Sequence, residues 1–253
     1  LERLMKGEDL SAKEMKEAMA GCFEQETTDT EITALLTALK MKGETAEEIA
    51  GMVEVIQSKS ELASLKLPDV MDNCGTGGDR SNSFNISTTT AFVLAGAGMT
   101  VAKHGNRSVS SKTGSADVLE ELGVALTLSR KKIAEILKDN GIAFLFAPHV
   151  HANLRRFMKV RNELRLPTVF NLIGPLTNPL PLKTQLVGVY DRNKLRTIAE
   201  SLDQLGRKRA VVVNGAGYMD EASLAGENHL ALLKDGEIQL FTLDPEEVGL
   251  PVY

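Results

Sequence analysis

The residues best suited to chemistry lie in a glycine-rich stretch, DNCGTGGD, at positions 72–79, directly after an apolar run. Glycines between a strand and a helix let main-chain amides approach an anion, and the N-terminus of the helix adds a partial positive charge. The spacing matches neither the P-loop nor the dinucleotide-binding motif, since no Gly-Lys-Ser/Thr follows and Arg80 stands at the third glycine. The stretch therefore indicates either a phosphate-binding loop or a tight structural turn.

Hydroxyl side chains gather in the segment that follows. Ser and Thr supply six hydroxyls between Ser81 and Thr90, around the expected start of an apolar helix with Asn85 or Ser87 at its N-cap. Capping explains one of these hydroxyls and leaves the others unexplained. Hydroxyls at a helix N-terminus suit phosphate and metal-bound water, so the cluster favours a phosphate-binding loop.

A third polar segment follows the next apolar run, at positions 103–123. It presents Lys103, His104, Arg107 and Lys112 among glycines and serines, before a helix that is expected to begin near Ser115. A run of charges is usually a solvated surface, but a glycine- and serine-rich loop at the end of a strand suits a polyanion better. Three such loops in one chain predict a substrate with more than one phosphate.

The first part of the chain, residues 1–66, is predicted to be a helical domain. Ser11, Thr28 and Thr45 are each followed three positions later by glutamate, which is the capping-box pattern of a helix start. A bundle of this size buries only a modest core by itself. We therefore expect these helices to pack on the rest of the chain or on a second subunit, and we predict a homodimer.

The remaining residues, 67–253, alternate short apolar runs with helix-length segments. This pattern predicts an α/β domain with a mainly parallel central sheet flanked by helices, and Asp235-Gly236 predicts a hairpin near its end. The segment near 165–182 is expected to pack on the helical domain. Ligands of such sheets bind at the carboxyl ends of the strands, where the three polar loops should lie.

Composition argues against several classes of partner. A net charge of -5, no Trp and 4% aromatic residues disfavour a nucleic-acid or membrane-surface protein, because these usually carry a basic face or stacking aromatics. The chain has two cysteines, Cys22 and Cys74, without a paired spacing, and it contains no signal-like or transmembrane run. These features predict a cytoplasmic protein.

Four motifs in order resemble the anthranilate phosphoribosyltransferases of tryptophan biosynthesis, a family with a helical N-terminal domain that is related to nucleoside phosphorylases. They are GTGGD (75–79), FNIST (84–88), KHGNRSVSSKTGSADVLEELG (103–123) and FNLIGPLTNP (170–179). The resemblance implies transfer of the 5-phosphoribosyl group from phosphoribosyl pyrophosphate (PRPP) to the amine of anthranilate. The products would be N-(5-phosphoribosyl)anthranilate and pyrophosphate, with Mg²⁺ required.

The resemblance also implies a donor site built from the three loops. The residues expected to contact PRPP are Gly75, Gly78, Asp79, Ser83, Asn85, Ile86, Ser87, Thr88, Lys103, His104, Gly105, Asn106, Arg107, Ser108, Val109, Ser110, Ser111 and Ser115. Ser83 stands where the family usually has a threonine, so the hydroxyl is kept.

The acceptor, metal and catalytic roles are implied in the same way. Anthranilate would contact Gly75, Asn106, His151 and Arg161, with Arg161 pairing its carboxylate. Magnesium would be held by Ser87, Asp220 and Glu221. Lys103 would stabilise the departing pyrophosphate together with magnesium and the glycine-loop amides, and His104 or His151 would take the proton from the amine.

The chain departs from the family pattern at specific positions. Arg165 and Pro167 stand where the family has glycine and arginine, and Tyr218-Met219 stands where it has glycine-leucine. The geometry of the anthranilate site is therefore less constrained by the resemblance than that of the donor site. Family chains continue past the final hairpin, so we expect the C-terminal part of the family fold to be missing.

Other interpretations stay open at this point. A pyrimidine nucleoside phosphorylase shares the architecture, but its glycine loop has an inserted residue before the acid. A non-catalytic, nucleic-acid-binding relative would lose the glycine loop and gain a basic surface. A small-molecule binding protein could use the same loops without turnover. For single residues, His104 could cap a loop, and the adjacent acids Asp220 and Glu221 could form an exposed turn.

Overall fold

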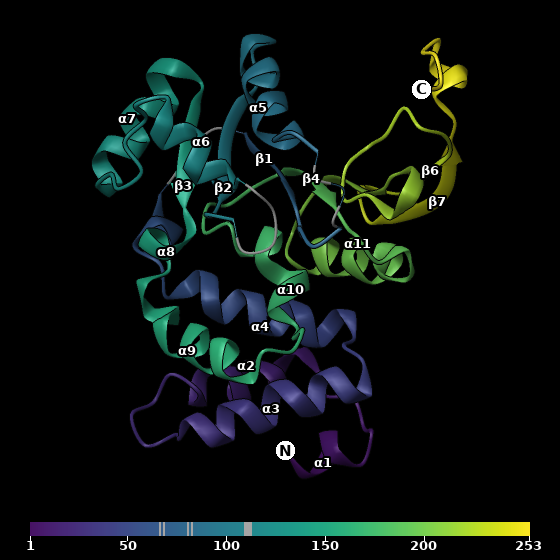
Figure 1. The fold of residues 1–253 in the computed structure, drawn as a ribbon. Helices are drawn as coiled ribbons and strands as arrows, with labels where there is room; N and C mark the ends of the chain where they lie inside the picture. Colours follow the sequence, from purple (N-terminus) through teal and green to yellow (C-terminus); the bar gives the residue numbers. More distant parts are fainter. Residues whose placement is uncertain (66, 68, 80, 82, 109–112) are drawn as a thin grey trace.

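The computed structural model describes residues 1–253 apart from 66, 68, 80, 82 and 109–112. Figure 1 shows a helical part at the N-terminal end and an α/β part above it. The helical part contains α1 (Glu2–Met5), α2 (Ala12–Gly21), α3 (Asp29–Lys42), α4 (Ala46–Ser58) and the 3-10 turn η1 (Glu61–Ser64). No helix of the described residues combines the length and apolar character needed to cross a bilayer.

The predicted capping boxes are all present. Ser11, Thr28 and Thr45 each accept a hydrogen bond from the amide three residues later, and the glutamate at that position accepts from the amide of the cap. Each cap stabilises its helix by roughly 1 kcal/mol and fixes where the helix begins. The starts of α2, α3 and α4 are therefore encoded locally.

The described residues of the α/β part form one seven-stranded sheet with the order β3-β2-β1-β4-β5-β6-β7. The strands are β1 (Val70–Gly75), β2 (Thr100–Gly105), β3 (Ile142–Phe146), β4 (Thr184–Gly188), β5 (Arg209–Asn214), β6 (Asn228–Lys234) and β7 (Glu237–Leu243). The first five are parallel, and β6 and β7 are antiparallel. This confirms the predicted fold class.

The strand order reverses between β1 and β4, because β2 and β3 extend to one side of β1 while β4 and β5 extend to the other. Such a switch point opens a crevice at the carboxyl ends of the strands. Gly75 and Gly188, the last residues of β1 and β4, lie in register there. The predicted hairpin is also confirmed, with Asp235 and Gly236 at positive φ between β6 and β7.

Helices cover both faces of the sheet (Figure 1). The helices beside the sheet are α5 (Ile86–Gly96), α6 (Ser115–Glu121), α7 (Arg130–Asn140), α8 (Ala147–Val150) and α11 (Leu195–Gln204), while α9 (Arg155–Leu164) and α10 (Phe170–Ile173) lie against the helical part. The 3-10 turns are η2 (Ala152–Leu154), η3 (Gly174–Thr177), η4 (Arg192–Lys194), η5 (Ala216–Tyr218) and η6 (Pro245–Val248). On one face α5 packs through Ala91 on Met71 and Val101.

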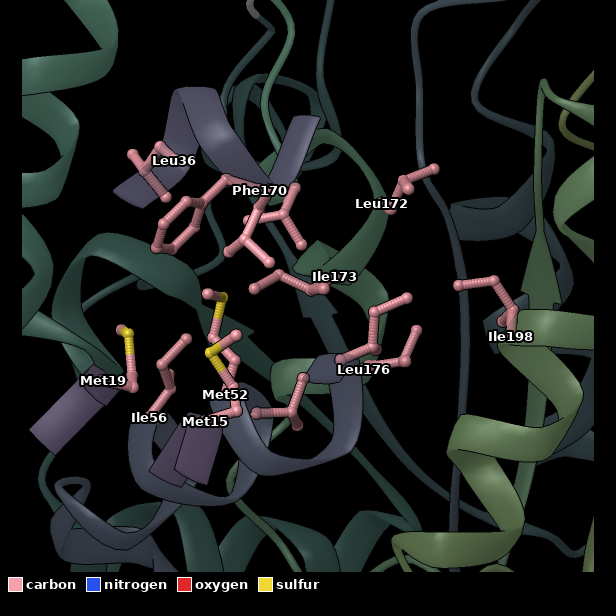
Figure 2. Packing of buried hydrophobic residues seen from close by; sticks show 14 of the residues in the cluster. Met15, Met19, Leu36, Met52, Ile56, Phe170, Leu172, Ile173, Leu176 and Ile198 are labelled. Atoms are coloured by element: carbon pink, nitrogen blue, oxygen red, sulfur yellow. The ribbon is translucent and has the colours of Figure 1, made fainter. Parts of the chain in front are cut away.

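One apolar cluster runs from the helical part into the sheet. It joins Met15 and Met52 of the bundle to Ile173 and Leu176 and continues to Ile198 of α11. Figure 2 shows these side chains gathered in one packed region. The side-chain amide of Gln57 in α4 donates to the carbonyls of Leu176 (3.0 Å) and Asn178 (2.8 Å). The segment after α9 is thus anchored to the helical part and cannot move independently of it.

Candidate active site

The glycine loop follows β1 directly and folds over the end of β4. The amide of Thr76 donates to the carbonyl of Gly188 (2.9 Å), and the amide of Tyr190 donates to the Thr76 hydroxyl (3.4 Å). Gly77 and Gly78 have φ of 71° and 85°, a conformation that favours glycine. The loop therefore lies at the switch point of the sheet, where a ligand crevice is expected.

The acidic pair Asp220 and Glu221 reaches this loop from the segment after β5. The amide of Gly77 donates to Asp220 Oδ2 (2.5 Å), and the amide of Ser87 donates to Glu221 Oε1 (3.2 Å). Asp220 is only 8% exposed, so the pair does not form an exposed turn. Burial raises the pKa of Asp220 to about 6, and burial together with the Asp220 charge raises the pKa of Glu221 to about 7.

Asp79 ties the glycine loop to the acidic segment. Its Oδ1 accepts from the amide of Ser81 (3.2 Å), and its Oδ2 accepts from the amide of Asp220 (3.4 Å). The Ser81 hydroxyl in turn donates to the Ser83 hydroxyl (3.2 Å). The carboxylate at the end of the glycine run thus has a structural role. It closes a short turn and accepts a hydrogen bond from the acidic segment.

Lys103 lies on β2 beneath the start of α5 and is 3% exposed. Its ammonium donates to the carbonyl of Asn73 (2.6 Å) and to the Ser87 hydroxyl (3.3 Å). The side-chain amide of Asn73 donates to the carbonyl of Ser87 (2.7 Å). These bonds join β1, β2 and the first turn of α5, and they place a cation next to the predicted phosphate-binding amides.

Residues that the sequence interpretation did not assign support this arrangement. Asp72 is fully buried and accepts from the amide of His104 (3.1 Å) and from Asn178 Nδ2 (3.0 Å). Burial raises the pKa of Asp72 to about 6, against the opposing effect of the Lys103 charge. The sequence did contain a signal for these residues, because Asp72 and Asn73 are adjacent polar residues inside an otherwise apolar strand. A buried polar side chain requires hydrogen-bond partners, so such a pair predicts a polar network.

The third loop meets the start of α5 and the start of α6. Asn85 occupies the N-cap position of α5 but makes no capping bond, and its Nδ2 donates instead to the Thr113 hydroxyl (3.2 Å). The carbonyl of Asn106 accepts from the Ser115 hydroxyl (3.2 Å). A Cβ added at Gly105 would overlap the Ser115 hydroxyl. These contacts bring Asn85, Gly105, Asn106 and Ser115 to neighbouring positions.

Some of the residues predicted to contact PRPP pair with other protein groups in this structure, and others lie outside the described residues. Arg107 pairs with Glu120 through both terminal nitrogens (2.7 and 2.8 Å) and with Asp117 (3.1 Å), so its charge is neutralised by α6. The amide of Ser108 also donates to Asp117 (3.0 Å). The predicted contacts Val109, Ser110 and Ser111 lie outside the described residues. Ile86 opens α5, and the Thr88 hydroxyl is buried without a partner among the described residues.

His104 and His151 meet edge to face, with ring centroids 5.4 Å apart and an interplanar angle of 88°. They are 3% and 4% exposed. Burial lowers the pKa of His104 to about 3 and that of His151 to about 4, so both rings are neutral at pH 7. Within the described residues His104 Nε2 has no hydrogen-bond partner, and the main chain of Thr177 raises the pKa of His151 against the larger effect of burial. Neutral imidazoles with such nitrogens can accept a proton or a hydrogen bond.

Arg161 of α9 lies over the ring of Phe170, with 5.3 Å from its Cζ to the ring centroid. Burial lowers the pKa of this guanidinium, and no carboxylate of the described residues pairs with it. A guanidinium beside an aromatic ring can bind a planar aromatic acid by combining a bidentate ion pair with ring stacking. The position therefore suits the carboxylate of anthranilate.

Two of the four departures from the family pattern, Arg165 and Tyr218, fall where the backbone is left-handed. Arg165 closes α9 with φ of 53°, and Tyr218 has φ of 63° directly before the acidic segment. Glycine adopts this conformation without the steric cost that a side chain brings. The ring of Tyr218 lies 4.6 Å from the Arg192 guanidinium, an attractive contact that offsets part of the cost.

Two of the oxygen donors predicted to hold magnesium, Ser87 and Glu221, meet at the start of α5, and the third, Asp220, precedes Glu221 in the chain and contacts the glycine loop. Ser87, Asp220 and Glu221 supply a hydroxyl and two carboxylates, which are the hard ligands that Mg²⁺ prefers. Glu221 already contacts the amide of Ser87, so their oxygens lie close together. The residues present therefore fit a magnesium ion by ligand type and by proximity.

Comparison with known proteins extends these observations. Residues 67–253 match the model of the glycosyl transferase family a/b domain, and residues 1–60 match that of its helical bundle domain. The anthranilate phosphoribosyltransferase of Oceanobacillus iheyensis is 58% identical over 253 residues, all of this chain and 74% of the relative.

Solved structures give the same result. The anthranilate phosphoribosyltransferase of Thermus thermophilus superposes with a TM-score of 0.92 at 39% identity, covering 100% of this chain and 75% of that one. The Saccharomyces cerevisiae enzyme in complex with PRPP and Mg superposes with a TM-score of 0.85 at 28% identity, covering 96% of this chain and 71% of that one.

Proposed function

The chain belongs to the anthranilate phosphoribosyltransferase family, and from this premise we propose how its own residues carry out the reaction. It transfers the 5-phosphoribosyl group of PRPP to the amine of anthranilate and releases pyrophosphate, as the four sequence motifs predicted. The observation that carries the assignment of the site is the convergence of the Gly77 amide, Ser87 and Lys103 at the switch point of the sheet.

We assign the donor to the crevice between the glycine loop and α5. The main-chain amides of the loop and of the first turn of α5 donate to phosphate oxygens, and Lys103 adds a full positive charge beneath them. Ser87, Asp220 and Glu221 would hold magnesium, which would supply further positive charge to the departing pyrophosphate when bound. The presence of PRPP and Mg in the yeast relative supports this assignment.

The reaction breaks the bond between C1 of the ribose and the pyrophosphate oxygen and forms a bond from C1 to the anthranilate nitrogen. Positive charge develops on the ribose and negative charge on the pyrophosphate. Lys103 and the loop amides stabilise the negative charge most strongly at the transition state, where it is largest. No covalent nucleophile on the protein is required.

Anthranilate is placed by Arg161, which clamps its carboxylate and leaves the amine directed toward C1. Aromatic amines are largely unprotonated at neutral pH, so positioning contributes more to the rate than deprotonation does. The amine loses a proton after attack, and His151 or His104 accepts it, because both rings are neutral. Gly75 and Asn106 also border the acceptor in this assignment.

One assay tests the proposed function. The fluorescence of anthranilate is followed after addition of PRPP and magnesium to the purified chain, with an EDTA-treated sample as the control. We expect a magnesium-dependent loss of anthranilate fluorescence. No loss with intact protein, combined with phosphorolysis of thymidine or uridine, would assign the chain to the nucleoside phosphorylases instead.

We also propose that the protein is a cytoplasmic homodimer that associates through its N-terminal helices. Met5 and Met41 in this part are 78% and 84% exposed, which supports an apolar contact surface there. Both cysteines are free thiols, in keeping with a reducing compartment. Light scattering at micromolar concentration tests the dimer, and a monomeric mass would exclude it.

A further inference from the structure

Two main-chain amides that a phosphate group would need are already bonded to carboxylates of the protein. The amide of Gly77 in the glycine loop donates to Asp220, and the amide of Ser87 in the first turn of α5 donates to Glu221. The same pair of adjacent acids therefore serves both anion-binding elements, although it comes from a distant part of the chain. In chemical terms the carboxylates occupy the positions of an anionic ligand.

The protein backbone is shaped to admit these acids. A Cβ added at Gly75 would overlap the carboxylate of Asp220, and a Cβ added at Gly188 would overlap its main-chain carbonyl. The acidic segment is also fixed at its ends, by the bond from the Gly215 amide to the Met219 carbonyl (2.9 Å) and by the bond from the Ser223 amide to Asn228 (2.7 Å). The fold therefore favours this contact on both sides: the glycines leave room for the acids, and hydrogen bonds hold the acidic segment in place.

The consequence depends on whether the incoming anion carries a cation. A metal-free polyphosphate must displace both carboxylates from their amides and then lie beside their negative charge, which is unfavourable at short range in a partly buried site. A magnesium-bound polyphosphate brings a cation for which carboxylate oxygens are good ligands. The acids can then exchange the amides for the metal, and the amides become available to the phosphates.

We propose that Asp220 and Glu221 determine the specificity of the donor site for magnesium-bound polyanions by competing with metal-free polyanions for the amides of Gly77 and Ser87. This inference rests on the proposed function, because it concerns the same donor site. The two acids would thus have a second role besides that of metal ligands. In the absence of metal they compete with anions for the two amides.

Calorimetric titration of the purified chain with pyrophosphate, in EDTA and in magnesium, tests the proposal. The double variant D220N/E221Q removes both charges with little change of shape. Glu227→Gln is the matched control, because Glu227 lies on the same segment, is 55% exposed and contacts only His229 among the described residues. We expect the double variant to bind metal-free pyrophosphate about tenfold more tightly than the unmodified chain, and E227Q to behave like the unmodified chain.

Two results would overturn the inference. One is equal affinity of the unmodified chain for pyrophosphate with and without magnesium. The other is no gain of metal-free affinity in a double variant that still melts cooperatively; if that variant does not fold, D220N and E221Q are titrated singly, and the same criterion applies. Failure of the unmodified chain to bind PRPP in the presence of magnesium would instead contradict the proposed function, so the two failures are distinguishable.

Discussion

The carboxylate of Asp220 accepts a 2.5 Å hydrogen bond from the amide of Gly77, across 143 residues of chain. This contact joins the loop after β1 to the segment after β5, over the end of β4. The loop that we propose binds the donor and the acids that we propose hold its metal are thereby one structural unit. Substitutions that disturb the contact should change donor binding more than acceptor binding.

Gly188→Ala should separate the two loops. The added Cβ would overlap the main-chain carbonyl of Asp220, so the acidic segment must shift. We expect the free energy of unfolding to fall by roughly 1–3 kcal/mol and the magnesium-dependent affinity for PRPP to fall about tenfold or more. Denaturant unfolding and calorimetry measure these changes. Gly21→Ala is the control, since its Cβ would meet no atom within 4 Å; a G188A variant with unaltered PRPP affinity would contradict the prediction.

Asp220→Asn should weaken the response to magnesium. The substitution removes the charge of a carboxylate ligand but keeps the shape of the side chain. We expect the half-saturating magnesium concentration to rise about tenfold, with less than about a twofold change in the KM for anthranilate. Asp244→Asn, which alters an exposed cap of η6, serves as the control. An unchanged magnesium titration would remove Asp220 from the metal site.

Arg161→Ala should affect the acceptor alone. Loss of a charge-assisted, bidentate contact with the anthranilate carboxylate is expected to raise the KM for anthranilate by about 10- to 100-fold and to leave the KM for PRPP unchanged. Steady-state kinetics with each substrate varied in turn give both values. Arg155→Ala, an exposed arginine on the same helix, should change neither. Equal effects of R161A on both substrates would mean that Arg161 organises the fold.

Arg165→Gly should stabilise the protein. Arg165 has φ of 53° at the end of α9, a conformation that costs a side-chain-bearing residue roughly 1 kcal/mol relative to glycine. We expect a gain of about that size in the free energy of unfolding, measured by urea denaturation. Arg155→Gly places glycine at the exposed first residue of the same helix, where it should lose less than the roughly 1 kcal/mol that glycine costs in a helix interior. Destabilisation by R165G would show that its side chain makes a stabilising contact.

The histidine pair should contribute a loss of stability in mild acid. In the native state the pKa of His104 lies near 3 and that of His151 near 4, whereas an unfolded histidine titrates near 6.5. Below pH 6.5 the unfolded chain therefore binds protons that the native chain does not, and stability falls as the pH falls. Each histidine contributes a slope of up to about 1.4 kcal/mol per pH unit.

Removing one histidine tests this effect. His151→Gln should flatten the fall of the unfolding free energy between about pH 6 and pH 4.5 by about one histidine's contribution, as measured by urea denaturation at several pH values. His149→Gln, a substitution of an exposed histidine two residues away, is the matched control. Asp72, Asp220 and Glu221 act in the opposite direction, because their raised pKa values cost stability as the pH rises toward about 6 to 7, but all three are present in both variants and cancel. Identical slopes for H151Q and H149Q would show that His151 is not buried as a neutral ring.

Local features could be predicted with confidence from the sequence because they depend on neighbouring residues. The capping boxes at Ser11, Thr28 and Thr45 each involve residues three apart, and the Asp235-Gly236 hairpin needs only the turn and its flanking strands. Asn85 was expected as an N-cap and occupies that position, but its side chain bonds to Thr113 instead. Arg107 was predicted to bind phosphate and is paired with α6 in this structure. In both cases a partner distant in sequence competes with the local interaction.

The sequence by itself determined that the chain has helices with fixed starts, apolar strands, glycine loops that admit anions, and the family to which it belongs. Only the tertiary structure decided which loops meet. The contacts of Asp220 with Gly77, of Lys103 with Asn73, and of His104 with His151 depend on the placement of β1 between β2 and β4. Strand order is set by packing of the whole sheet against its helices, an energy that no short stretch of sequence contains.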